Sequence, residues 1–198
     1  MSDGEATASP EAATETDQAA DSDDEYSGLF GAFPYAFRHS KSRLFKIYAA
    51  VGGLAAAFIA LQFIISLLVV VSNTLGAGGG TFTFARSFVI VVGALVLAPV
   101  LAPILYVARR ARLQAVSHER YDFVMGLLGF GFLLALYVGI VIAMPESFEF
   151  GDTTTTRPEP SGLFAPVIRV LYALPQLVGI LPPTLVGVSI PLVDRYLR

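Results

Sequence analysis

Long runs of apolar residues, separated by short polar segments, fill this chain from residue 47 onward. Three of these runs cover residues 47–71, 84–107 and 123–144. Each exceeds the ~20 residues that an α-helix needs to cross the hydrocarbon core of a bilayer. A fourth run, residues 163–193, is longer than one span and contains five prolines. The pattern predicts an all-α, polytopic membrane protein with four transmembrane helices.

The fourth run allows two arrangements. In the first, a surface helix occupies its beginning and a span follows over residues 174–193. In the second, a span covers residues 163–181 and breaks at the following Pro-Pro pair, so that the remainder leans on the inner face of the membrane. We favour the first arrangement because it puts Asp194, Arg195 and Arg198 directly at the membrane boundary, where charged side chains reach water.

The polar segments around the runs differ in character. Residues 72–80 end in three glycines and predict a flexible turn. Residues 146–161 contain four successive threonines and two prolines, and we expect an irregular loop there. Residues 28–46 mix aromatic and basic side chains, which suits either a segment lying on the membrane surface or a flexible linker. Pro34 should interrupt or begin any helix in that segment.

The expected orientation follows from the basic segment at residues 108–122. This segment contains four arginines: Arg109, Arg110, Arg112 and Arg120. Lysine and arginine in short loops stay on the cytoplasmic side during insertion. Across the whole layout, ten basic residues fall at the proposed inner ends of the spans and three at the outer ends. We therefore expect this segment and both termini to lie on the cytoplasmic side of the cell membrane.

The composition indicates the same class of protein and adds a tail. Of the 198 residues, 55% are hydrophobic and 15% are charged, which is too apolar for an ordinary soluble domain. Residues 1–25 hold nine acids and no Lys or Arg. A segment so acidic and so poor in large apolar residues cannot offset its ordering entropy. We expect a disordered acidic tail over residues 1–27, a juxtamembrane segment over 28–46 and a membrane domain over 47–198.

No constellation of catalytic or metal-binding residues is visible in the sequence. The chain has no cysteine, and both histidines, His39 and His118, lie in basic segments rather than in the apolar runs. The spans lack the acidic or histidine relay of proton-coupled transporters, and they offer no Ser–His, paired-Asp or metal-ligand set for an intramembrane hydrolase. We therefore expect no enzyme activity, no catalytic, cofactor-binding or metal-binding residues, no cofactor and no nucleic-acid partner.

Arg169 is the one charged residue that could enter the membrane away from the ends of the predicted spans. One interpretation is a candidate contact for an anion or a lipid headgroup at the outer side. The other, which we favour, is a residue at a helix end whose stem lies in lipid while its guanidinium reaches water.

Small residues recur every four positions in two of the spans. They are Gly131, Ala135, Gly139 and Ala143 in the third span, and Ala49, Gly53 and Ala57 in the first. Small side chains at this spacing let two helix backbones approach closely, so we expect both rows to pack against other helices, within the chain or between subunits. Gln62 and Ser66 share a face of the first span, and we expect them to hydrogen-bond to a neighbouring helix rather than to a substrate.

The style of the composition suggests a source. The tail is rich in acids, alanine and threonine, and the chain has eleven arginines against two lysines. The chain resembles the small, uncharacterised multi-span membrane proteins of halophilic archaea. The resemblance implies that the protein functions at high salt. At 1 M salt the electrostatic screening length is about 3 Å, so attraction between the tail, the basic segment and lipid would be weak.

Two functions fit these observations. We favour a non-enzymatic accessory or assembly protein, whose partners are membrane lipid and either other membrane proteins or further copies of itself. The alternative is a component of an oligomeric transporter or channel, in which a path forms only on oligomerisation. A broken fourth span would favour transport, because discontinuous helices often line the binding sites of transporters.

Overall fold

A computed structural model describes residues 28–75, 80–114, 119–150 and 153–197, and the predicted acidic tail lies outside these residues. The elements are α2 (Gly28–His39), α3 (Arg43–Asn73), α4 (Gly80–Gln114), α5 (Glu119–Ala143), β1 (Ser147–Phe150), β2 (Thr153–Thr156), α6 (Ala165–Tyr172), the 3-10 helix η2 (Gln176–Ile180) and α7 (Leu181–Tyr196). Four helical segments are long and apolar enough to cross a membrane: Arg43–Asn73, Thr83–Leu113, Glu119–Ala143 and Gln176–Tyr196. The predicted helical class with four potential spans is confirmed by helix length and composition.

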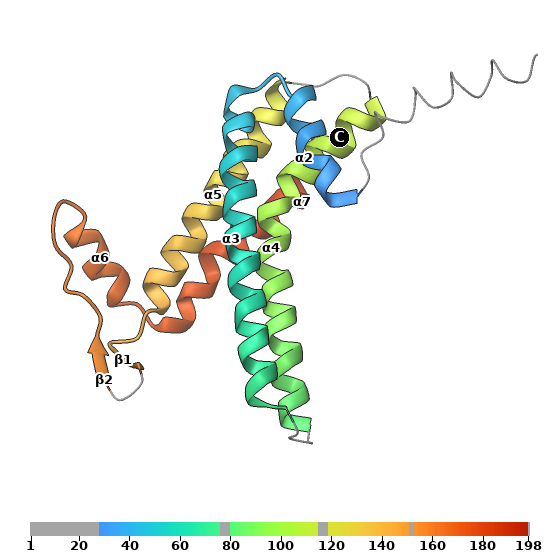
Figure 1. Cartoon of the computed structure of the whole chain (residues 1–198). Coiled ribbons are helices and arrows are strands. Elements are labelled where there is room, and N and C mark those ends of the chain that lie inside the picture. Colours follow the sequence, from blue (N-terminus) through green and yellow to red (C-terminus); the bar gives the residue numbers. More distant parts are fainter. Residues whose placement is uncertain (1–27, 76–79, 115–118, 151–152, 198) are drawn as a thin grey trace, which may run out of the picture.

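The long helices form two pairs that meet at one end of the molecule. α3 and α4 make an antiparallel hairpin, and α5 packs against η2 and α7 (Figure 1). The two pairs come together where α2 also lies, and they diverge toward the opposite end. The structure describes all of α3, and its buried residues are confined to the first half, from Phe45 to Ala56. We call the end at which the pairs meet the α2 end.

Glycines of α5 let α3 approach closely at the α2 end. A Cβ atom on Gly126 would lie 3.0 Å from the Cα of Phe45, and one on Gly129 would overlap the ring of Tyr48. Tyr48 is fully buried, and its hydroxyl donates a hydrogen bond of 2.5 Å to the carbonyl oxygen of Val100. Val100 lies between Pro99 and Pro103 of α4, which have no N–H and so leave the carbonyl oxygens of Leu95 and Pro99 without their helical donors. α3 thus supplies a partner for the backbone of α4 at the place where proline weakens it.

α2 passes through Pro34 without ending, so the prediction that this proline interrupts or begins the helix is wrong. The proline removes one backbone hydrogen bond, and packing offsets the loss. Ala32 and Ala36 are fully buried. On the same helix, the ring of Phe33 lies so close to Gly53 of α3 that a Cβ atom on this glycine would be 2.9 Å from the ring.

An arginine closes the far end of the α3–α4 hairpin. The guanidinium of Arg86 in α4 donates to the carbonyl oxygen of Thr74 at 2.8 Å and to its hydroxyl oxygen at 2.7 Å. Thr74 is the C-terminal cap of α3, so the positive charge of Arg86 lies where the helix dipole favours a cation.

Regular secondary structure occupies parts of two segments that were expected to be loops. In the basic segment 108–122, which the sequence suggested as a short loop, α4 continues to Gln114 and α5 begins at Glu119, so most of the segment is helical. In the segment 146–161, β1 and β2 form an antiparallel hairpin with Ser147 opposite Thr156. The irregular loop expected there is therefore wrong. β-branched threonines favour extended backbone, and here they pair with the alternating Phe-Glu-Phe of β1.

The fourth apolar run divides into a short helix, α6, and a longer helical segment made of η2 and α7. This division is that of the first arrangement considered above, with a short helix ahead of the segment long enough to span. The Pro-Pro pair lies in the first turn of α7, where backbone N–H groups have no helical partner and proline is tolerated. The Pro-Pro pair therefore begins α7 and lies within the helical segment Gln176–Tyr196.

Candidate functional site

Buried and half-buried polar side chains from several elements gather at the α2 end. We call them the α2-end polar cluster: Ser40, Arg110, Tyr121, Asp122 and Asp194. The two carboxylates are almost inaccessible, with exposed fractions of 2% for Asp122 and 5% for Asp194. A buried carboxylate is strongly unfavourable unless it is hydrogen-bonded or paired. The contacts of these two residues therefore decide what the cluster does.

One half of the cluster ties the α2–α3 turn to α5. The hydroxyl of Ser40 donates a hydrogen bond of 2.7 Å to Oδ2 of Asp122, and it accepts one of 3.2 Å from the N–H of Ser42. Ser42 in turn caps α3, because its hydroxyl oxygen accepts from the N–H of Phe45. Asp122 lies in the first turn of α5, where the helix dipole favours a negative charge.

The other half of the cluster ties α4, α5 and α7 together. The hydroxyl of Tyr121 donates a hydrogen bond of 2.5 Å to Oδ1 of Asp194 in α7. The guanidinium of Arg110 lies 4.1 Å from the centre of the Tyr121 ring. Its Nη1 also donates a 3.0 Å hydrogen bond to the carbonyl oxygen of Leu197, just after α7 ends. Arg110 thus stabilises the C-terminus of α7 while it stacks on a residue of α5.

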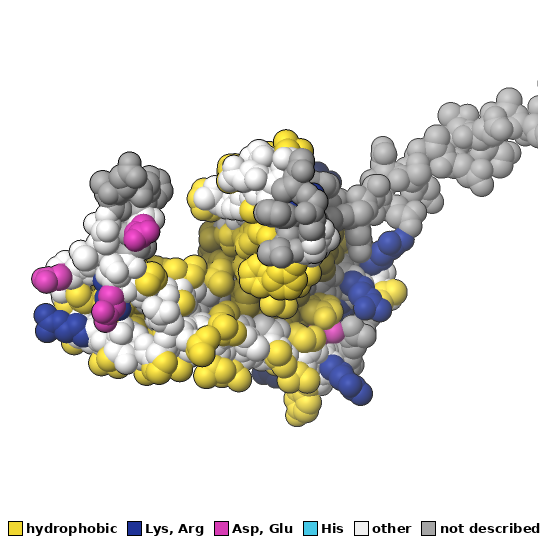
Figure 2. Space-filling view, turned by 90° about the horizontal axis from the view of Figure 1, so that it is seen from below, with side chains coloured by type: hydrophobic (Ala, Val, Ile, Leu, Met, Phe, Trp, Pro, Cys, Tyr) yellow, Lys and Arg dark blue, Asp and Glu magenta, His cyan; other side chains and the backbone are white. Residues whose placement is uncertain are grey.

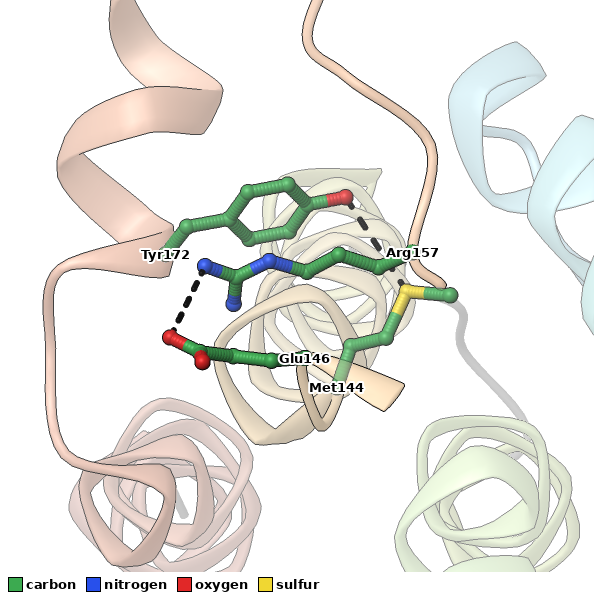
Figure 3. A network of polar contacts seen from close by, with 4 residues as sticks. All are labelled: Met144, Glu146, Arg157 and Tyr172. Carbon is green, nitrogen blue, oxygen red and sulfur yellow. Dashed lines mark hydrogen bonds and ion pairs between the residues drawn. The ribbon is translucent and has the colours of Figure 1, made fainter. Parts of the chain in front are cut away.

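A second polar group lies at the opposite end of α5, beside α6 (Figure 3). The guanidinium of Arg157 lies 4.2 Å from the centre of the Tyr172 ring, and its Nη2 is 3.7 Å from Oε1 of Glu146. The hydroxyl of Tyr172 points at the sulfur of Met144, 3.9 Å away. Because the Glu146 side chain is 87% exposed, its ion pair with Arg157 contributes little stability.

Two clefts adjoin this second group. The first, of about 440 Å³, is lined by Glu146, Arg157, Glu159, Arg169, Tyr172 and neighbouring residues. The second, of about 570 Å³, extends toward Gln176 at the start of η2. In the first cleft, two glutamates offset two arginines, so its lining gives no strong net attraction for an anion. Arg169 is exposed, and its predicted contact with an anion or a lipid headgroup stays a prediction.

The small residues predicted for packing face different neighbours. On α5, Gly139 and Ala143 lie against Gly179 of η2, and Ala135 is buried. A Cβ atom on Gly131 would meet its nearest neighbour at 3.8 Å, an ordinary van der Waals distance. Within this chain, the row thus lies on the side of α5 that faces η2 and α7.

On α3, the predicted small and polar residues have different surroundings. Gly53 packs under a ring of α2, whereas Ala57 is exposed. Gln62 and Ser66 are exposed, and neither side chain hydrogen-bonds within the described part of the chain. The helix to which they were expected to bond is therefore not among these elements.

The four arginines predicted to set the topology all lie at the α2 end, on the last turns of α4 and the start of α5. Arg109, Arg112 and Arg120 are exposed, and Arg110 belongs to the polar cluster. That the α2 end faces the cytoplasm stays a prediction.

The buried carboxylates are the residues that sequence reasoning missed. The sequence pattern places Asp194 at the membrane boundary and assigns Asp122 no role. The sequence around Asp122 carries no signal of its burial, because its partner Ser40 is 82 residues away along the chain. Among the described residues, no group of three or more His, Asp or Glu side chains could hold a metal ion.

Comparison with known proteins identifies a family whose function is unknown. No curated protein and no solved structure matches the chain. The model of a domain of unknown function, DUF8056, matches residues 7–198, which is nearly the whole chain. This match names no source, so the resemblance to proteins of halophilic archaea stays a prediction. On the extent of the match, the chain belongs to the DUF8056 family.

Proposed function

We propose that the chain is a non-enzymatic membrane protein that acts as an accessory or assembly subunit and holds other membrane proteins through its helix surfaces. One observation supports this most. In the described part of the chain, every buried side-chain nitrogen or oxygen has a hydrogen-bond partner. The α2-end polar cluster accordingly serves to join α4, α5, α7 and the α2–α3 turn, which is a structural use of groups that could otherwise perform chemistry.

The apolar surface of the α3–α4 hairpin also supports an accessory role. Away from the α2 end, large side chains of both helices are exposed, including Leu68 at 63% and Leu95 at 70%. Figure 2 is seen from the end opposite α2 and shows hydrophobic side chains over much of that face. In a bilayer, such a surface is open to lipid and to helices of other proteins, which associate through packing and hydrogen bonds.

The test is purification from native membranes in mild detergent, followed by depletion of the chain. We expect a second membrane protein to co-purify in a fixed ratio, and its amount in the membrane to fall when the chain is absent. A membrane protein that co-purifies without any such dependence would count against an accessory role, because chance association in detergent gives the same result.

Transport is the alternative, and the cleft beside α6 is the observation that favours it. Arg157 and Arg169 line this cleft and provide cationic contacts, although Glu146 and Glu159 balance their charge. The purified chain in lipid vesicles should give no more anion leak than protein-free vesicles if it is an accessory protein. A flux that saturates with anion concentration and falls in Arg169→Gln would overturn the accessory role in favour of transport.

A further inference from the structure

A polar amide lies exposed in the middle of α3. Gln62 is three residues past the centre of the apolar run 47–71, about 4.5 Å along the helix. Its side chain is exposed and forms no hydrogen bond with the residues that the structure describes, and the same holds for Ser66 one turn later. Unpaired polar groups are strongly unfavourable in hydrocarbon, where water cannot replace the missing partner. At this depth the amide needs a partner from another helix.

Gln62 lies on a stripe with a seven-residue repeat. At alternating intervals of three and four residues, α3 carries the residues that we call the Gln62 stripe: Val51, Ala55, Phe58, Gln62, Ile65, Val69 and Ser72. All are exposed except Ala55, which is half-buried. This spacing is that of the seam of a left-handed coiled coil, and Gln62 shares its heptad position with Ala55 and Val69.

The stripe is separate from the face of α3 that packs on α4. The next residue, Phe63, lies against Gly93 of α4, where a Cβ atom would be 3.1 Å from the ring. Successive residues are about 100° apart around a helix, so Gln62 points well away from this contact. Toward the same end of the molecule, α5 and α7 have diverged from α3 (Figure 1). The fold therefore leaves the stripe open, with Phe58 63% and Val69 51% exposed.

We propose that the Gln62 stripe is the seam of a homodimer, in which α3 of two copies pack in parallel and the two Gln62 amides hydrogen-bond to each other. An amide has donors and an acceptor, so two copies related by a two-fold axis satisfy one another. Copies of one chain insert in the same orientation, which brings both amides to the same depth. A single polar residue at a seam position also fixes the register of the pair.

A second copy is a better partner than an unrelated helix for the same reason. An unrelated helix would need a polar group at the depth of Gln62, whereas a second copy provides one by symmetry. The apolar members of the stripe then supply the packing contacts on either side of the amide pair. This inference does not depend on the accessory role, because a dimer fits an assembly subunit and a transport component equally well.

Cysteine cross-linking in native membranes tests the seam, because the chain contains no cysteine of its own. Ile65→Cys places a thiol on the stripe. The matched control is Ile64→Cys, an adjacent isoleucine of similar exposure (55% against 47%) that points away from the stripe. We expect mild oxidation to give a disulfide-linked homodimer from Ile65→Cys and little from Ile64→Cys. Equal yields, or cross-linking of Ile65→Cys only to a different protein, would overturn the proposal.

A second measurement tests the amide itself. The dimer dissociation constant can be measured by energy transfer between labelled copies in vesicles. We expect Gln62→Leu to raise it about 7-fold, from the loss of two interhelical hydrogen bonds of average strength. Gln62→Asn keeps an amide and should raise it less. An unchanged dissociation constant in Gln62→Leu would show that the amides do not pair. Co-purification of a partner protein is a separate readout, so failure of the dimer and failure of the accessory role are distinguishable.

Discussion

Replacing Gly139 with alanine should force α5 away from η2, because the two backbones touch at this glycine. A Cβ atom on Gly139 would overlap the carbonyl oxygen of Gly179 and lie 3.2 Å from the ring of Pro183. In the reverse direction, a Cβ atom on Gly179 would lie 2.5 Å from the carbonyl oxygen of Gly139. The obstructing oxygen belongs to the backbone and cannot rotate away, so the helices themselves must move.

Gly131→Ala is the matched control and isolates the packing contribution. Alanine is more favourable than glycine inside a helix by about 0.5–1 kcal/mol, and both substitutions gain this amount. The added methyl group at Gly131 would meet its nearest neighbour at 3.8 Å, so no overpacking is expected there. At Gly139 the methyl group has no room, and overpacking typically destabilises by about 1–3 kcal/mol. The free energy of unfolding should therefore be lower in Gly139→Ala than in Gly131→Ala by that amount.

Thermal unfolding in one detergent, followed by circular dichroism, provides the comparison. For a chain of this size, about 2–4 °C in melting temperature corresponds to 1 kcal/mol, so a difference of roughly 2–12 °C is expected. Gly131→Ala should melt at or slightly above the parent protein. Equal melting temperatures for the two variants would refute the close approach of α5 and η2.

Three further expectations concern the ends of the molecule. Asp122→Ala removes a buried hydrogen-bonded carboxylate and should lower the free energy of unfolding by about 1.5–3 kcal/mol, whereas the exposed Glu119→Ala on the same turn should lower it by less than about 1 kcal/mol. Equal losses would mean that burial does not matter here. Arg86→Gln should lower the free energy of unfolding by about 1 kcal/mol, because the hydrogen bonds to Thr74 at the end of α3 are lost. An unchanged free energy would show that this contact is not formed. A cysteine at Thr154 should react with an impermeant reagent in intact cells and one at Gln114 should not, while the reverse result would invert the proposed orientation.

The long helices could be predicted because the apolar length of a segment is a local property of the sequence. No knowledge of the fold is needed to see that the run starting at residue 47 can cross a bilayer. The prolines of the fourth run left two arrangements open, because a proline can begin a helix, as in α6 and α7, or lie inside one, as Pro191 does. The threonine hairpin was missed for a local reason, since polarity was given more weight than the strand preference of β-branched residues.

The candidate site could not be predicted because its contacts join distant parts of the chain. Ser40 and Asp122 are 82 residues apart, and Tyr121 and Asp194 are 73 apart. Nothing near Asp122 in the sequence distinguishes a solvated carboxylate from a buried one. The exposed face around Gln62 is a different case. Its heptad spacing is visible in the sequence, but only the fold shows that no helix of the described chain covers it.

The α2-end polar cluster has a consequence for biosynthesis. The bond between Tyr121 and Asp194 forms only after the 73 residues from one partner to the other have been synthesised. At about 5–20 residues per second, a ribosome needs several seconds to pass from one partner to the other. During that interval α5 has been made while its tyrosine lacks the aspartate of α7. A chain truncated before α7 would lack the bond between Tyr121 and Asp194 permanently, so α5 would have to fold without its contacts to α7.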